Sequence, residues 1–310
     1  MKHFPHVAII LLNWHSYIDT SECLNSLCKS TYQNRTIIVV DNGSRDDSAD
    51  QLENEFSEIS LLRTGENLGF AAGNNVGITH AIEQGADYFL LLNNDTLVSP
   101  GFLEPAIDYA ENSPNVGLVG GKIYFAQPST LIWDAGGRID WLRGHGKREG
   151  TRLIDTGLYE DVRQTTFVTG CMMLIKRSVI DRVGLLPEEY FFGVEEWDYS
   201  VQVSRAGFKL AYIPEFKIWH KVGQAHNDLS PKYVYSYMRG RMLFMRRNAP
   251  RYWYLVWLLS MRLQSYYKKH IQFPKLAPDV ATDLANALDK AFLDHRLKSA
   301  ITRDDLEQFA

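Results

Sequence analysis

Residues 89–96 read FLLLNNDT, an apolar run that stops abruptly at two amides and a carboxylate. A short, nearly continuous apolar run is typical of a parallel strand that is buried on both faces of a sheet. The run Val7–Leu12 ends in the same way at Asn13, and the run Thr36–Val40 ends at Asp41. Ligands of such sheets bind beyond the carboxyl ends of the strands. The polar residues after these three runs are therefore expected to face one crevice.

The rest of the chain extends this pattern. In the first half, strands are expected at 7–12, 36–40, 59–62 and 88–92, with helices at 19–30, 46–56 and 71–84. This alternation predicts an α/β fold with a doubly wound sheet between helices. In the second half, the pattern predicts a strand at 166–176, a helix at 195–205, extended segments at 210–214 and 217–220, and helices from Pro231 onward, the last at 279–298. Residues 1–230 are expected to form the sheet domain and residues 231–310 a helical C-terminal region.

Composition narrows the class of protein. The 310 residues are 45% hydrophobic and 23% charged, which is ordinary for a globular protein and not for a disordered one. The formal net charge is -4, and no block of Lys and Arg argues for a nucleic-acid partner. The three cysteines lack the spacing of a zinc site and are interpreted as reduced thiols of a cytosolic protein. The N-terminal apolar run, about seven residues without a small-residue cleavage site, is interpreted as a strand and not a signal peptide.

The segment 251–270, RYWYLVWLLSMRLQSYYKKH, has a dense aromatic and leucine core with basic ends. As a helix, its apolar part would span about 18 Å, too short to cross a bilayer. It is either a packed C-terminal helix or an interfacial helix that rests on a membrane. The nearby Arg239, Arg241, Arg246 and Arg247 either bind phosphates of a donor or lipid, or form a solvated helix face.

Three segments near the expected crevice suit a nucleotide and a metal ion. Asp95, beside two amides, is a candidate ligand for Mg²⁺ or Mn²⁺ that bridges to a diphosphate, although Asn and Asp also form turns. Asp41 ends a buried run, where a charge needs a partner such as a nucleobase N–H or a ribose hydroxyl. Gly69 and Gly73 let backbone approach a ligand at a helix N-terminus, where phosphate is favoured.

Two further segments carry candidate catalytic or metal-binding groups. Residues 195–198, EEWD, place three carboxylates within one helical turn, next to an aromatic run. Crowding and apolar neighbours can raise a carboxyl pKa and create a general base, while the alternative is a solvated helix start that favours acids. His220, at the expected end of a strand, is either a structural residue or a metal ligand.

Taken in order, seven segments resemble family 2 glycosyltransferases of the GT-A fold, and within that family bacterial rhamnosyltransferases of surface polysaccharide assembly. The resemblance spans roughly residues 5–250 and implies the GT-A type of mixed sheet. Each motif alone is weakly specific, but seven in this order are strongly so. The matching segments are VAIILLNW, VVDNGSRDDS, ENLGFAAGNN, LLLNNDT, VTGCMMLIKR, YFFGVEEWDYSVQVSRAGFKL and IWHKVG.

The resemblance implies a role for each matching position. Glu196 falls at the family's catalytic base, and Asp95 with His220 at its metal ligands, for Mg²⁺ or Mn²⁺. The implied donor contacts are Asn13, Asp41, Asn67, Gly69, Asn74, Asn94 and Asp95. The implied acceptor and sugar region comprises Thr169, Gly170, Glu195, Trp197 and Asp198. Two departures stand out: the family's Asp-x-Asp has become Asn93-Asn94-Asp95, and the base is Glu where Asp is usual.

These matches imply an inverting, metal-dependent transferase that moves a sugar from a nucleotide-diphosphate donor to an acceptor hydroxyl. Rhamnose from dTDP-rhamnose is the closest suggestion for the sugar, with UDP-sugars open, and a glycan or lipid-linked glycan is the expected acceptor. The expected location is the cytoplasm, peripherally at the inner face of the membrane, with a homo-oligomer as an open alternative. Two rivals are a non-catalytic nucleotide-sugar-binding protein with a decayed transferase fold and a sugar nucleotidyltransferase. The latter would need a basic, Gly-rich N-terminal loop, which residues 11–22 lack.

Overall fold

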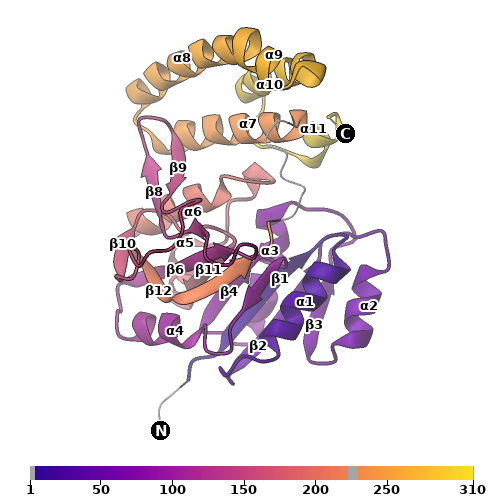
Figure 1. Cartoon of the computed structure of the whole chain (residues 1–310), viewed down its shortest axis with the longest axis vertical. Coiled ribbons are helices and arrows are strands. Elements are labelled where there is room, and N and C mark those ends of the chain that lie inside the picture. Colours follow the sequence, from indigo (N-terminus) through magenta and orange to yellow (C-terminus); the bar gives the residue numbers. More distant parts are fainter. Residues whose placement is uncertain (1–3, 223–229, 310) are drawn as a thin grey trace.

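The computed structural model describes residues 4–222 and 230–309. A mixed sheet of ten strands lies at its centre, in the order β10-β12-β6-β11-β4-β1-β2-β3, with β5 paired to β12 and β7 to β6 (Figure 1). A separate hairpin pairs β8 with β9. The strands are β1 Val7–Asn13, β2 Arg35–Asp41, β3 Ile59–Arg63, β4 Tyr88–Leu92, β5 Thr96–Val98, β6 Val116–Phe125, β7 Ile132–Asp134, β8 Gly137–Asp140, β9 His145–Arg148, β10 Arg163–Thr165, β11 Met172–Lys176 and β12 Lys209–His220.

The four strands predicted from the first half are confirmed as one parallel unit. β1 lies between β2 and β4, and β2 also pairs with β3, all in parallel. The register places Asn13 directly beside Asp41 at the carboxyl ends of β1 and β2. The predicted convergence of polar strand ends is therefore present at this edge of the sheet.

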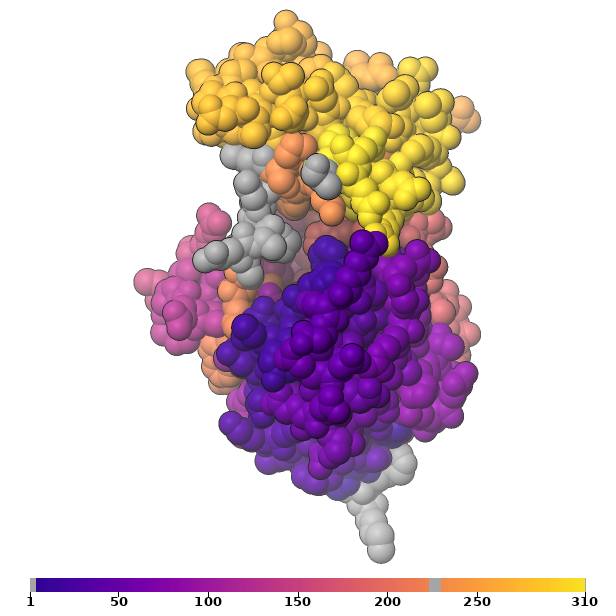
Figure 2. Space-filling model, turned by 90° about the vertical axis from the view of Figure 1, so that its right-hand side faces the viewer, coloured from indigo at the N-terminus to yellow at the C-terminus, as the bar shows by residue number. Residues whose placement is uncertain are grey.

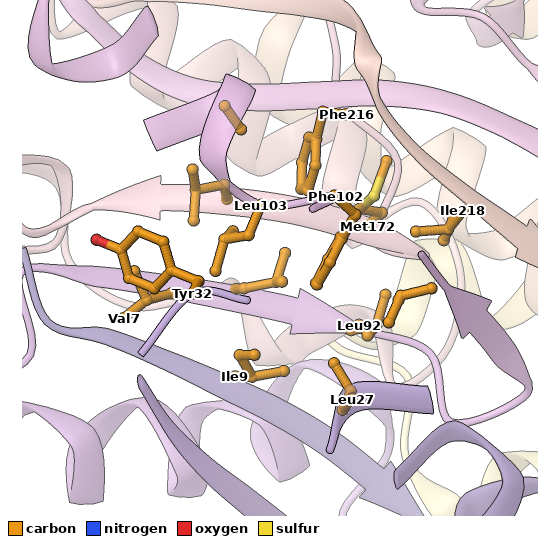
Figure 3. Close-up of a cluster of buried hydrophobic side chains, with 14 of the residues drawn as sticks. Val7, Ile9, Leu27, Tyr32, Leu92, Phe102, Leu103, Met172, Phe216 and Ile218 are labelled. Atoms are coloured by element: carbon orange, nitrogen blue, oxygen red, sulfur yellow. The ribbon is translucent and has the colours of Figure 1, made fainter. Parts of the chain in front are cut away.

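Helices cover both faces of the sheet because its strands are apolar on both sides. One face buries Val7 and Ile9 of β1 against Leu24 of α1 and Ile107 of α4; Figure 3 shows Val7 and Ile9 in this cluster. The other face buries Ile10 against α3, α5 and α6. These helices are α1 Tyr17–Leu27, α2 Ser48–Glu55, α3 Phe70–Glu83, α4 Glu104–Glu111, α5 Arg177–Val183 and α6 Glu195–Arg205, with the 3-10 turn η1 at Glu188–Tyr190.

Two predictions for the second half need correction. The single strand expected at 166–176 is wrong, since β11 begins only at Met172 and the chain before it leaves the sheet around Thr169 and Gly170. The two extended segments expected at 210–214 and 217–220 are one strand, β12. The register of β12 on β6 shifts between Ile213 and Lys217. This interval contains Pro214, which cannot donate a ladder hydrogen bond.

The C-terminal helices form a layer over the carboxyl edge of the sheet (Figures 1 and 2). Ser230 caps α7 by accepting a hydrogen bond from the Tyr233 N–H. A hydrophobic cluster joins this layer to η1 and α6 through Tyr190 and Trp197, so the two regions share a core. The elements are α7 Pro231–Asn248, α8 Arg251–Tyr267, the π-turn η2 Lys268–Gln272, α9 Phe273–Leu276, η3 Pro278–Val280, α10 Ala281–Leu297 and α11 Arg303–Glu307. Among the described residues, none of these helices is long and apolar enough to cross a membrane.

Candidate active site

A polar network closes the carboxyl ends of β1 and β2. The Asn13 amide donates to the Asp41 carboxylate at 2.9 Å and accepts from the Thr20 hydroxyl at 2.9 Å. The Ser44 N–H donates to the second Asp41 oxygen, and Asn94 donates to Thr20 at 2.7 Å. Because Asn13 and Asp41 are almost fully buried, these bonds fix the side chains that were expected to meet a nucleotide.

The loop before α3 is held against the same edge. The Asn42 side chain donates to the Gly69 carbonyl at 3.1 Å and accepts from the Leu68 N–H at 3.0 Å. Asn67 accepts from the Gly69 N–H at 2.9 Å. Gly69 has φ +84°, and a Cβ there would lie 2.3 Å from the Phe191 carbonyl oxygen. Only glycine fits this approach, so Gly69 ties the loop to the segment that precedes Glu196.

Two of the expected site residues, Asn74 and Trp197, are buried and contact other parts of the fold. Asn74 is buried in α3, and its amide donates to the Phe70 carbonyl one turn earlier. The Trp197 ring is buried among Phe167, Tyr237 and Phe244. The Asn74 amide thus bonds to its own helix and the Trp197 ring packs in an aromatic cluster.

Asp198 also lies in the interior, where it joins three elements. One oxygen accepts from the Tyr190 hydroxyl at 2.8 Å and pairs with Arg247 at 3.2 Å. The other accepts from the Asn248 amide at 2.8 Å. The Asp198 carboxylate therefore fastens α6 to η1 and α7.

Asp95 and His220 meet because β5 pairs with β12. Thr96 lies opposite His220 in this antiparallel ladder, which brings the preceding Asp95 to the end of β12. Asp95 Oδ1 and His220 Nε2 are 3.0 Å apart. Asp95 and His220 are 125 positions apart in the sequence, so the β5–β12 register, and not a local sequence pattern, brings them together.

The pair suits a hard divalent cation in its chemistry and its spacing. Two ligands at right angles on an octahedral Mg²⁺, each about 2.1 Å from the ion, would lie about 3 Å apart, and the observed separation is 3.0 Å. His220 is buried, and its Nδ1 has no hydrogen-bond partner among the described residues. No third Asp, Glu, His or Cys completes a metal cluster within 4–222 and 230–309. Phosphate oxygens of a substrate and water are suitable further ligands for a cation held by this pair.

Glu195 and Glu196 open α6 on a strained turn. Val194, the residue before them, has φ +81°, which is an outlier for a β-branched side chain. Burial raises the pKa of Glu195 well above its usual range, and the charge of Glu196 raises it further. Burial also raises the pKa of Glu196, while the helix N–H groups and Arg148 oppose that rise. A carboxyl with a raised pKa that keeps a cationic neighbour is suited to proton transfer.

The segment Thr169–Gly170 lies against this base. A Cβ at Gly170 would lie 2.9 Å from the Phe70 ring and 4.0 Å from Glu196 Cβ. The Thr169 hydroxyl accepts from the Cys171 N–H at 3.4 Å. In the segment between β10 and β11, Gly170 thus lies against the start of α3 and next to Glu196.

The sequence reasoning missed three residues near the site, of which Trp133 and Arg148 connect its two halves. The Trp133 ring meets the His220 ring edge-on, with centroids 4.7 Å apart. The Arg148 guanidinium lies 3.9 Å from the Trp133 ring centre, and its charge acts on Glu196. Burial raises the pKa of Asp134 to about 8, against the opposing charge of Arg148. A signal was present, because Ile132 and Trp133 form an apolar run that ends at a carboxylate, as residues 89–95 do.

A cavity of about 180 Å³ lies between the sheet edge and the C-terminal layer. Residues after β1 and β2 and the expected donor residue Asn67 form one side, and residues of α7 and α11 form the other. The lining residues of α7 and α11 were not among the predicted site residues; the C-terminal residues considered there for donor phosphates were Arg239, Arg241, Arg246 and Arg247. The lining residues are Trp14, His15, Gly43, Arg45, Asn67, Phe191, Lys232, Arg303, Leu306 and Glu307.

Comparison with known proteins agrees with this architecture. Residues 9–184 match the model of glycosyl transferase family 2. The chain belongs to this family. This confirms the resemblance read from the sequence, and the chain is a glycosyltransferase by family membership.

Two characterised relatives are rhamnosyltransferases. The N-acetylglucosaminyl-diphospho-decaprenol L-rhamnosyltransferase of Mycobacterium tuberculosis is 24% identical over 264 residues, covering 78% of this chain and 86% of the relative. A dTDP-rhamnosyl transferase of Shigella flexneri is 23% identical over 224 residues, covering 70% of this chain and 72% of the relative.

The fold is also that of a solved glycosyltransferase. A mannosyltransferase of Pyrobaculum calidifontis, solved with GDP-Man and Mn²⁺, superposes with a TM-score of 0.59 at 13% identity, covering 95% of this chain and 88% of that one. The likeness confirms the predicted GT-A type of mixed sheet between helices.

Proposed function

We propose that this glycosyltransferase is inverting and metal-dependent, and that it moves a sugar from a nucleoside-diphosphate donor to an acceptor hydroxyl. The observation that carries the proposal is the pairing of Asp95 with His220 at 3.0 Å. The His220 ring meets Trp133, Arg148 stacks on Trp133, and the charge of Arg148 acts on Glu196. A cation site and a base linked in this way can act on the two ends of a single displacement.

The reaction follows from these positions. Glu196 accepts the proton of the acceptor hydroxyl while its oxygen forms a bond to the anomeric carbon. The bond from that carbon to the diphosphate oxygen breaks on the opposite face, and the diphosphate leaves with the electron pair. A bound Mg²⁺ or Mn²⁺ supplies positive charge for the diphosphate. Positioning of donor and acceptor together supplies much of the remaining rate.

The two named relatives support a choice of substrates. We propose dTDP-rhamnose as the donor and a lipid-linked glycan as the acceptor, for surface polysaccharide assembly. Such an acceptor places the enzyme peripherally at the inner face of the cytoplasmic membrane, with contact through residues 251–270. Nucleotide contacts are assigned to Asn13, Asp41, Asn67 and Gly69.

A transfer assay tests this proposal. The protein is given dTDP-rhamnose or a UDP-sugar with a soluble analogue of the acceptor, in Mn²⁺ or in excess chelator. Metal-dependent transfer is expected, with the product's anomeric configuration opposite to that of the donor. Retained configuration would reject the inverting mechanism. Nucleotide-sugar binding without transfer or hydrolysis in any metal would favour the decayed, non-catalytic alternative.

A further inference from the structure

The outer side of α8 carries a continuous apolar face. Its large side chains recur at intervals of three and four residues, which places them on one side of the helix. Each is more than half exposed, so no part of the described chain covers them. Figure 1 shows α8 at the end of the molecule farthest from the sheet. The residues of this apolar face are Tyr252, Leu255, Val256, Leu259, Leu263, Tyr266 and Tyr267.

The charged side chains in the segment that carries this face are all positive. Residues 251–278 contain no Asp or Glu, although the whole chain has a net charge of -4. Lys269 pairs with Asp289 of α10, outside the segment. The five Lys and Arg residues of the segment are Arg251, Arg262, Lys268, Lys269 and Lys275.

A groove of about 480 Å³ lies where α7, α8 and α10 meet, and we call it the arginine groove. Among the described residues, no carboxylate pairs with the guanidinium groups of Arg246, Arg262 or Arg296. The Arg246 guanidinium donates to the His295 carbonyl at 3.2 Å. The groove is lined by Arg246, Tyr254, Leu258, Arg262, His295 and Arg296.

The four arginines at 239, 241, 246 and 247, considered together in the sequence, have different partners in the structure. Arg239 and Arg241 are buried and donate to His295 and to the Gly144 carbonyl, respectively. Arg247 pairs with Glu189 and Asp198. Arg246 alone of the four lines the arginine groove.

Hydrogen bonding prepares a further donor in the arginine groove. Arg239 can only donate, so His295 Nδ1 accepts its N–H at 3.1 Å. Burial and the charges of Arg239 and Arg246 lower the pKa of His295 to about 3, so the ring is neutral and its proton is on Nε2. Nε2 then donates to the Tyr254 hydroxyl oxygen, 2.5 Å away. The Tyr254 O–H is left to donate to a groove ligand.

The arginine groove borders the apolar face. Tyr254, Leu258 and Arg262 follow one another at four-residue spacing on α8, along the flank of that face. Guanidinium and hydroxyl donors without a carboxylate are the chemistry of a phosphate site. A phosphate site next to exposed leucine and tyrosine side chains is suited to a phospholipid, whose phosphate lies beside its acyl chains.

We propose that α8 docks on an anionic lipid bilayer, with its apolar face in the headgroup boundary and a lipid phosphate in the arginine groove. This deepens the proposed function, since it rests on an acceptor carried by the membrane. The sheet edge and its site lie on the other side of α7 from this surface (Figure 1).

Sedimentation with vesicles tests the docking surface on the full chain. Vesicles of phosphatidylcholine are compared with vesicles that also contain phosphatidylglycerol. Binding is expected only to the second kind, and equal binding to both, or to neither, overturns the proposal. The variant L259S/L263S should bind at least tenfold more weakly, and R262Q/R296Q about fivefold per charge removed. The matched controls I154S/L158S and K29Q/R182Q change exposed side chains of the sheet region and should bind normally.

Three further measurements separate the outcomes. Circular dichroism shows that each variant is folded. If L259S/L263S binds vesicles normally but turns a dimer into a monomer, the apolar face covers a second copy and the proposal fails. If inorganic phosphate binds the arginine groove while R262Q/R296Q keeps its vesicle binding, the groove is a free-phosphate site and that half of the proposal fails. Transfer to the soluble acceptor analogue, measured without vesicles, tests the proposed function separately.

Discussion

Arg148 stacks on Trp133, with its guanidinium carbon 3.9 Å from the ring centre. The same ring meets His220, the partner of Asp95, edge-on. Arg148 also opposes the rise in the pKa of Glu196. The arginine therefore links the candidate metal ligands to the candidate base, and its charge partly offsets the effect of burial on the pKa of that base.

Replacing Arg148 by Gln is expected to move the pH dependence of transfer. Glu196 must be ionised to accept a proton, and loss of the nearby positive charge raises its pKa further. The acidic limb of the rate profile should shift upward by about one pH unit, with activity recovered at higher pH. The measurement is kcat/KM from pH 5 to 9. R138Q, which removes an exposed arginine of the same hairpin, is the control, and an unmoved limb in R148Q would contradict the charge effect.

Replacing Glu196 by Gln is expected to lower transfer by about 10²–10⁴-fold, because the amide cannot accept the proton. Nucleotide binding should be nearly unchanged, since the predicted nucleotide contacts lie at the ends of β1 and β2. Turnover and donor affinity are measured together. E83Q, an exposed change on α3, is the control. Turnover near that of the parent protein would exclude Glu196 as the base.

Replacing His220 by Gln is expected to weaken metal use without preventing nucleotide binding. Thermal stabilisation by Mn²⁺ plus a nucleoside diphosphate reports the loss, since a ligand that binds only the folded protein stabilises it by RT ln(1 + L/Kd), where L is the free ligand concentration. The Mn²⁺ concentration for half of the effect should rise by roughly tenfold or more. D95N should behave similarly, and H80Q should resemble the parent. An identical Mn²⁺ response in all four proteins would remove both residues from the metal site.

The sequence predicted the elements that local pattern determines. Continuous apolar runs located β1 to β4, and polar residues that end such runs located Asp41 and Asp95. Contacts made by distant segments were beyond that pattern. Trp133 and Arg148 lie on strands of three and four residues, too short for periodicity to reveal. Their partner His220 reaches them only through the pairing of the mixed sheet.

Side-chain roles were harder to predict than positions. Asp198 and Trp197 occupy the predicted helix, yet their burial is set by η1 and α7, which pack on it from far along the chain. The lack of space for a side chain at Gly170 likewise comes from a distant segment, the ring of Phe70 in α3. Packing by distant segments of this kind cannot be recognised from the periodicity of the local sequence.

Replacing Asp134 by Asn is expected to flatten the dependence of stability on pH. The folded pKa is about 8, against 3.8 for the ordinary group, so between these values the unfolded chain releases a proton that the folded protein keeps. The free energy of unfolding therefore falls as pH rises through this window, by up to about 1.4 kcal/mol per pH unit. Asn cannot ionise, so D134N should lose less stability between pH 5 and 8. Urea unfolding at several pH values measures this, with D108N as an exposed control, and parallel curves for D134N and the parent protein would show that Asp134 is not held neutral.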